Sequence, residues 1–225
     1  MPVALSVPHG EARAALVGAL EGFQAAVAPL DDHALLAASR CWGWTVVDVV
    51  THVRLGLDEL GAGLLAGAER ETATHDAASY WHTQPPGGDA VDGLLAVRRA
   101  AAATRAPRGA LVPLDRVADA LAAAAGRLPD RVLAFQGCAL TTGDLLATWA
   151  VELAVHQLDL ARDLDVPPPG AVALGLTRRT LEALLEAPLP IADDTDAVLL
   201  GTGRRTPSPA ERDALGTAAG RLPVL

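Results

Sequence analysis

Three side chains in this sequence could together bind a divalent metal ion. Glu152 and His156 are four residues apart, so on a helix they lie one turn apart on the same face. Apolar residues flank both, and a carboxylate in such surroundings needs a partner because burying a bare charge is very costly. His52 lies at the edge of a separate apolar stripe, and a neighbouring helix could bring its imidazole to the same point. Three protein ligands with a fourth position open are typical of catalytic zinc.

The spacing alone leaves simpler interpretations open. A single histidine such as His52 is more often a hydrogen-bonded core residue than a ligand. A glutamate and a histidine spaced by four are also common as an ordinary pair on a solvated helix. Asp48 and Asp159 lie within one turn of His52 and His156, so they are candidates to orient the two imidazoles. Zinc suits these donors, but iron, nickel and manganese accept them too.

Such a site requires two neighbouring helices, and the sequence predicts both of them. Apolar residues repeat at helical spacing from Val46 to Leu64, and this helix should end near Gly67. A second helix can be capped by a threonine at 141 or 142 and is expected to run to about Leu164, before a run of three prolines. His52 belongs to the first helix, and the Glu–His pair belongs to the second.

Two further helical regions complete the predicted bundle. One runs from about residue 9 to 28, with apolar residues three and four apart. The other spans about residues 92–128, where two prolines and a glycine are expected to split it. Residues 68–92 are predicted to form a long irregular loop, and residues 131–138 a short extended piece. The four long helices predict an all-α fold of the four-helix-bundle type.

A small second unit is predicted after the proline run. We expect the bundle to occupy residues 1–166 and a C-terminal segment to occupy residues 167–225. That segment should contain a helix at about 172–186, a short strand at Ala197–Leu200 and a final helix from Ser208 with a proline at its first position. The predicted fold is therefore an all-α bundle with a small α/β appendage.

Composition excludes several classes of function. The net charge is −9 and the isoelectric point is near 5.0, which disfavours binding to nucleic acid. No apolar stretch of about 20 residues predicts a membrane span, and no signal peptide is evident, so the cytoplasm is the expected location. The two cysteines, Cys41 and Cys138, do not indicate a disulfide framework and are interpreted as small buried residues.

Two sequence motifs resemble a known family. Residues 43–52 read GWTVVDVVTH, and residues 145–161 read LLATWAVELAVHQLDLA. In order and in separation they are similar to the two signatures of the DinB-like, mycothiol-dependent maleylpyruvate isomerase family. The resemblance extends over roughly residues 9–165 and implies a DinB-like four-helix bundle with a metal ion near one end.

The resemblance also implies ligands and a cosubstrate. The family's metal ligands fall on His52, Glu152 and His156, and its cosubstrate is the small thiol mycothiol. A zinc-bound thiol is deprotonated, which makes it a nucleophile at neutral pH. In the isomerase the thiolate would add to a conjugated double bond, permit rotation and leave again. In S-transferase relatives it would attack an electrophilic substrate and stay attached.

The sequence is also compatible with two other functions. They are a metal-dependent hydrolase that uses a metal-bound water, and a non-catalytic small-molecule-binding protein with the same fold. The full isomerase has a larger C-terminal domain, whereas residues 170–225 follow the proline run here. Arg204 could pair with an anionic substrate as a catalytic residue, or it could be a surface arginine at a strand end. A homodimer stays open. Candidates for the pocket mouth are His75, Tyr80, Trp81 and His82.

Overall fold

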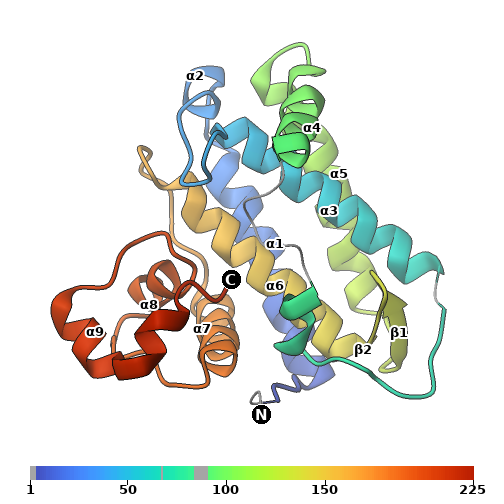
Figure 1. Ribbon diagram of the computed structural model, residues 1–225. Helices are drawn as coiled ribbons and strands as arrows, with labels where there is room; N and C mark the ends of the chain where they lie inside the picture. Colours follow the sequence, from blue (N-terminus) through green and yellow to red (C-terminus); the bar gives the residue numbers. More distant parts are fainter. Residues whose placement is uncertain (1–3, 67, 84–90) are drawn as a thin grey trace.

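The computed structural model describes residues 4–66, 68–83 and 91–225, and Figure 1 shows their arrangement. In this part of the chain, four long helices pack as a closed ring, in which α1 lies along α6, α6 against α3, α3 against α5 and α5 against α1. The predicted four-helix bundle is therefore confirmed. Its members are α1 (His9–Val27), α3 (Val46–Ala66), α5 (Leu111–Ala125) and α6 (Thr142–Leu160).

Leucine, valine and alanine fill the interior of the bundle, as the low aromatic content predicts. The largest fully buried side chains are mostly leucines, and each contributes roughly 1.5–3 kcal/mol by leaving water. The helices that carry the predicted metal ligands are among the most apolar, and nearly all of α6 is buried. The largest buried side chains of these helices are Leu16, Leu20 and Phe23 of α1, Leu57 and Leu60 of α3, and Leu145, Leu146 and Leu153 of α6.

The two ends of α6 have clear causes. Thr141 is the N-cap, and its hydroxyl accepts a hydrogen bond from the backbone N–H of Asp144. The helix ends at Leu160, four residues before the predicted Leu164. At this end Arg40 donates one backbone and two side-chain hydrogen bonds to three carbonyls of the last turn. Because those carbonyls have partners outside the helix, the chain turns away there.

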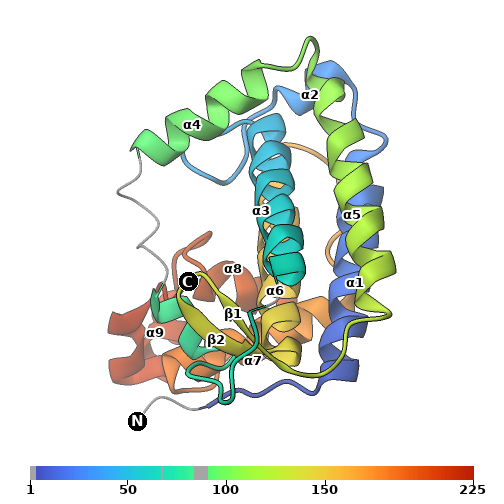
Figure 2. The ribbon, with the colours of Figure 1, turned by 90° about the vertical axis from the view of Figure 1, so that its right-hand side faces the viewer.

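The region predicted at residues 92–128 is split, as expected. It forms α4 (Val91–Ala102), a 3₁₀ turn η2 (Pro107–Ala110) and then α5. Figure 2 shows α4 lying across one end of the bundle, where it contacts α3 and η2, so that only α5 belongs to the four-helix ring. A short helix, α2 (Asp32–Leu35), also contacts η2 at this end.

The extended piece predicted at residues 131–138 is the first half of a hairpin. Strands β1 (Val132–Phe135) and β2 (Cys138–Thr141) pair antiparallel, and β2 leads directly into α6. Gln136 and Gly137 form the two-residue turn, and both have positive φ, of 47° and 80°, as a primed hairpin turn requires. In the predicted loop, residues 79–83 form the 3₁₀ helix η1 (Ser79–Thr83), and residues 84–90 lie outside the described residues.

The C-terminal segment is helical in the structure. Helix α7 (Ala171–Leu185) begins and ends within one residue of its prediction and packs against α6 and α1. The strand predicted at Ala197–Leu200 is wrong, because these residues belong to α8 (Asp194–Gly201). Asp193 caps α8 by accepting from the backbone N–H of Asp196, and a four-residue apolar run fits a helix as well as a strand.

The last helix begins as predicted. It is α9 (Pro209–Leu215), with a reciprocal capping box between Ser208 and Glu211, and a 3₁₀ helix η3 (Gly216–Arg221) follows. The appendage is thus not α/β in the part of the chain that the structure describes. The division at residues 166/167 stays a prediction, since α7 packs closely on the bundle. None of the described helices combines the length and apolarity needed to cross a bilayer.

Candidate metal centre

Three predicted donor side chains meet between α3 and α6. Oε1 of Glu152 lies 3.2 Å from Nε2 of His52 and 3.2 Å from Nε2 of His156. The two imidazole rings are 4.8 Å apart between centroids and meet edge to face. One ligand atom from each residue lies within 4.8 Å of the others. The structure therefore brings together residues that are a hundred positions apart, in a spacing that a single cation could bridge.

The packing of the two helices explains this convergence. Glu152 and His156 occupy successive turns of α6, and His52 lies in the second turn of α3, which packs against α6. The side chains of His52 and Glu152 are 34% and 26% exposed, whereas that of His156 is 9% exposed. A ligand would therefore reach the group from the side of His52 and Glu152.

The charges around the group suit a cation. Burial alone would raise the pKa of Glu152, but the two imidazoles beside its carboxylate hold the pKa below its usual range. Burial would likewise lower the pKa of His156, yet the carboxylates of Glu152 and Asp159 raise this pKa well above its usual value. Without a metal ion the two carboxylates thus hold a proton on the imidazole between them. A divalent cation would take the place of that proton, so the donor set fits a metal.

Asp159 orients His156, as the sequence predicts. Nδ1 of His156 lies 3.0 Å from Oδ2 of Asp159, and a proton on Nδ1 leaves the Nε2 lone pair free for a metal. Asp159 is completely buried and is held in turn by Arg204, whose Nε and Nη2 donate to its two oxygens at 3.0 and 2.9 Å. Burial would raise the pKa of Asp159, but His156 and Arg204 lower it.

The other predicted orienting residue has a different role. Asp48 does not reach His52, because its Oδ2 accepts hydrogen bonds from the backbone N–H and the hydroxyl of Thr45, at 2.9 and 2.7 Å. Asp48 therefore stabilises the first turn of α3. The ring that neighbours His52 is that of Trp44, with centroids 4.9 Å apart. The position of Asp48 in the sequence suggested that it orients His52, but its carboxylate instead caps the start of α3.

Arg204 does not lie at the end of a strand. It follows directly on α8 and Gly203, which has φ 71°. Its guanidinium is mostly buried and faces Asp159, and Nη1 donates to the carbonyl of Thr202. The interpretation as a surface arginine at a strand end is wrong. A direct contact between Arg204 and a substrate stays a prediction.

Cys41 is a site residue that sequence reasoning missed. It was expected to be a small buried residue, but it is half-buried and its thiol donates to Oδ2 of Asp159 at 3.1 Å. Its sulfur is also 3.9 Å from Nδ1 of His156. No spacing in the sequence links Cys41 to the distant helix, so no signal could have found it. Cys138 is buried, as expected.

A small cavity adjoins the donors. Its volume is about 150 Å³, and it includes His52 and Glu152 in its lining. Of the four loop residues predicted at a pocket mouth, Tyr80 and Trp81 line it, while the other two do not. Gly56 is required here, because a Cβ at this position would come within 2.7 Å of the Trp149 ring. The remaining lining residues are Val53, Glu59, Gln136 and Thr148.

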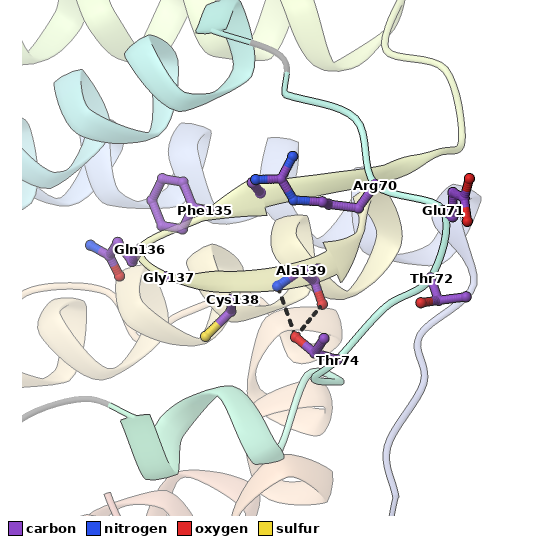
Figure 3. Close-up of a pocket in the computed structure, with 10 residues that line it drawn as sticks. Arg70, Glu71, Thr72, Thr74, Phe135, Gln136, Gly137, Cys138 and Ala139 are labelled. Atoms are coloured by element: carbon purple, nitrogen blue, oxygen red, sulfur yellow. Dashed lines mark hydrogen bonds between the residues drawn. The ribbon is translucent and has the colours of Figure 1, made fainter.

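A larger groove of about 490 Å³ lies over the β-hairpin, as Figure 3 shows. Thr74 bridges to β2 there, where its hydroxyl accepts from the backbone N–H of Ala139 at 3.0 Å. The charged side chains of its lining are Arg70 and Glu71, and no histidine is among the described lining residues. Its described lining residues include none of the three converging donors, which adjoin the smaller cavity instead.

Fold and site together define a helical-bundle protein with a candidate metal centre between two of its helices. The family model described as the mycothiol maleylpyruvate isomerase N-terminal domain matches residues 16–161, and the chain belongs to this family. Comparison with curated proteins gives no match.

Two crystal structures of mycothiol-dependent maleylpyruvate isomerase, one of them of a point mutant, resemble this chain. Each has a TM-score of 0.54 and 14% sequence identity, over 80% of this chain and 70% of the other. At this identity the likeness shows a shared fold.

Proposed function

We propose that this protein is a metal-dependent thiol transferase or isomerase that uses mycothiol as its cosubstrate. His52, Glu152 and His156 would hold a divalent cation, with zinc the best match to two imidazoles and one carboxylate. The observation that carries the proposal is the convergence of these three donors on one point, open on one side only. Membership of the mycothiol maleylpyruvate isomerase family supports mycothiol as the thiol.

The residues around this point would divide the work. When bound, a cation of this kind lowers the pKa of a thiol, so that the sulfur is a thiolate at neutral pH. Glu152 supplies one negative charge to hold the cation, and Asp159 fixes the ring of His156. Burial, followed by the charge of Glu152, raises the pKa of Tyr80, so its hydroxyl stays protonated and donates to Gln136. Tyr80 is therefore a wall of the cavity and not a base.

The electrophilic substrate would enter through the cavity beside His52 and Glu152. The side chain of His156 is too enclosed to admit it from the opposite side, where Asp159 and Arg204 fill the space. Isomerase and transferase chemistry share the first step, attack of the sulfur on an electrophilic carbon. They differ in whether the sulfur leaves again as a thiolate, taking the carbon–sulfur electron pair while the double bond of the substrate re-forms, or stays attached.

Metal analysis of purified protein tests the ligand set. We expect close to one metal ion per chain in wild type and little in His156→Ala, because two remaining donors bind weakly. His33→Ala is the matched control, since His33 is exposed on α2 and lies outside the donor group. Equal metal content in wild type and His156→Ala would remove the ligand assignment.

A cobalt-substituted sample tests the cosubstrate. Added mycothiol should produce a sulfur-to-cobalt charge-transfer band in wild type, which a water ligand does not give. Protein that binds cobalt and shows no such band would contradict thiol chemistry and favour a hydrolase.

A further inference from the structure

Aromatic rings wall the cavity beside the candidate metal centre, and, apart from His52, the charged side chains of its described lining are carboxylates. Tyr80, Trp81 and Trp149 supply the rings, and Glu59 and Glu152 supply the carboxylates. The chain has no lysine, and all 18 arginines lie in the described parts of the chain. None of these arginines is in the cavity lining. An anion that entered the cavity would therefore find no guanidinium or ammonium there.

The arginines closest in sequence or space to the donors are committed elsewhere. Arg204 binds both oxygens of Asp159 on the far side of His156, and its side chain is 20% exposed. Arg54, on the same helix as His52, pairs with Asp58 at 2.7 Å. Neither supplies a positive charge to the cavity lining. The structure thus has no counter-charge in place for a carboxylate of the substrate.

The metal ion and the thiolate of the proposed function do not supply a positive counter-charge for a carboxylate either. A divalent cation is balanced by Glu152 and by the thiolate, which leaves this part of the site neutral overall. Glu59 then remains as an uncompensated carboxylate in the lining. A second anion would be repelled by Glu59 and would lose its hydration without a partner, and both effects disfavour its binding.

Glu59 is exposed, and a short chain of hydrogen bonds places its carboxylate at the solvent-facing rim of the cavity. Tyr80 donates from its hydroxyl to Oε1 of Gln136 at 2.5 Å, and Nε2 of Gln136 donates to Oε1 of Glu59 at 2.9 Å. The amide therefore fixes the carboxylate relative to the aromatic wall. Burial raises the pKa of Tyr80, and the nearby carboxylates of Glu152 and Glu59 raise it further.

We propose, as an inference that rests on the proposed function, that the electrophile taken by this site is an uncharged molecule with an apolar or planar face. Glu59 is then a specificity-determining residue that excludes carboxylates. Apolar and aromatic walls favour such a face. The volume of about 150 Å³ admits only a small reacting group, below the range of roughly 300–1,000 Å³ typical of pockets for larger ligands. Dicarboxylates would be poor substrates.

Two alkylating agents of similar size and the same leaving group test this preference. Iodoacetamide is uncharged and iodoacetate is an anion. In both, the mycothiol sulfur forms a bond to carbon, the carbon–iodine bond breaks, iodide leaves with the electron pair, and the thiol proton passes to solvent. The readout is alkylated mycothiol formed by the zinc-loaded full chain, divided by the uncatalysed rate for each agent.

We expect the rate enhancement for iodoacetamide to exceed that for iodoacetate by about tenfold, the effect of one nearby carboxylate in a partly screened site. Glu59→Gln should narrow this ratio about three- to tenfold. Asp58→Asn is the matched control, because it neutralises the adjacent carboxylate on α3, which lies outside the cavity lining, and should leave the ratio unchanged. A ratio near one in wild type, or an equal change in both variants, would overturn the proposal.

A measurement without catalysis separates this proposal from the proposed function. Tryptophan fluorescence is quenched by acrylamide, which is uncharged, and by iodide, which is an anion. Trp81 and Trp149 line the cavity, and Trp42, which is 84% exposed, is replaced by Phe throughout so that it does not dominate. All samples have equal ionic strength, because salt screens the effect.

Iodide quenching should rise about twofold or more from the Trp42→Phe protein to its Glu59→Gln form, while acrylamide quenching and the Asp58→Asn form stay unchanged. Iodide quenching that is equal in all three proteins would overturn the charge selection, whatever the activity. Loss of all rate enhancement with both alkylating agents, together with the expected quenching, would overturn the proposed thiol chemistry and leave the selection by Glu59 standing.

Discussion

The two ring nitrogens of His156 face two different environments. Nε2 faces Glu152 and His52, on the side that opens to the cavity. Nδ1 faces a closed cluster of Asp159, Arg204 and Cys41. The open side has the donor atoms that a metal needs, while the closed side fixes the ring and balances its charge. The buried hydrogen bond at Nδ1 fixes the orientation of the His156 ring. The lone pair of Nε2 therefore stays directed toward the open side of the site.

The closed cluster also includes a residue that lies outside the part of the chain matched by the family model. The donors and Asp159 lie within residues 16–161, but Arg204 belongs to the C-terminal segment. The segment that follows the bundle therefore contributes to the support of a metal ligand.

The largest effect is expected on the open side. Glu152→Gln keeps the shape of the side chain but removes the charge that binds the cation, and zinc affinity should fall by at least about 100-fold, more than for any supporting residue. Competition with a chromophoric chelator measures it. Glu59→Gln, which neutralises a carboxylate of the cavity outside the donor group, should stay within about threefold of wild type. Similar losses in both would mean that general negative charge, and no defined donor, holds the metal.

On the closed side, Asp159→Asn should weaken zinc binding by about 10- to 100-fold, because the amide no longer fixes the tautomer of His156. Asp48→Asn is the informative control. Asp48 is four residues from His52 in sequence, and Asp159 is three residues from His156, but the carboxylate of Asp48 caps α3. It should keep the affinity and lower the free energy of unfolding by about 1 kcal/mol. Equal affinity losses would contradict the different roles assigned to the two aspartates.

The pH dependence of zinc binding links the two sides. The carboxylates beside His156 raise its pKa and so favour the protonated imidazole in the metal-free protein, and this proton must leave when the metal binds. Zinc affinity should therefore rise with pH, by about tenfold per unit for one proton, until the pH passes the pKa. Calorimetry in buffers of different ionisation enthalpy should detect about one proton released per zinc at pH 7. Binding without proton release would contradict the charge assigned to His156.

The smallest effect is expected from the C-terminal segment. Arg204→Met should weaken zinc binding by a few-fold and shift the visible bands of cobalt-substituted protein, because Asp159 loses the fork that positions it. Arg204→Lys should recover only part of both effects, since lysine restores the charge but not the paired geometry. If Arg204→Met kept the zinc affinity and the cobalt spectrum of wild type, the C-terminal segment would make no contribution to the site.

The sequence predicted the bundle because helices depend on local periodicity, whereas the ligand roles of His52, Glu152 and His156 were implied by the resemblance to a known family. Apolar spacing placed α1 and α3 within one or two residues of their observed ends, and a spacing of four put Glu152 and His156 on one face. The cap at Thr141 followed from its hydroxyl and from Asp144. Such features are decided within one or two helical turns, so a single chain reveals them.

The closed cluster could not be predicted in the same way. Cys41 and Arg204 reach Asp159 from segments more than 40 residues away on either side, and no local pattern marks such a contact. The strand expected at Ala197–Leu200 failed for a related reason, since four apolar residues carry no period and the cap at Asp193 decided the outcome. Tertiary packing determines these features.

Zinc-edge X-ray absorption of the zinc-loaded full chain tests the central claim most directly. The account predicts a first shell of nitrogen and oxygen at about 2.0–2.2 Å, with outer-shell scattering from two imidazoles. His52→Ala should reduce this scattering to that of one imidazole. Scattering from fewer than two imidazoles in wild-type protein, or a first shell in which sulfur from Cys41 replaces an imidazole, would contradict it.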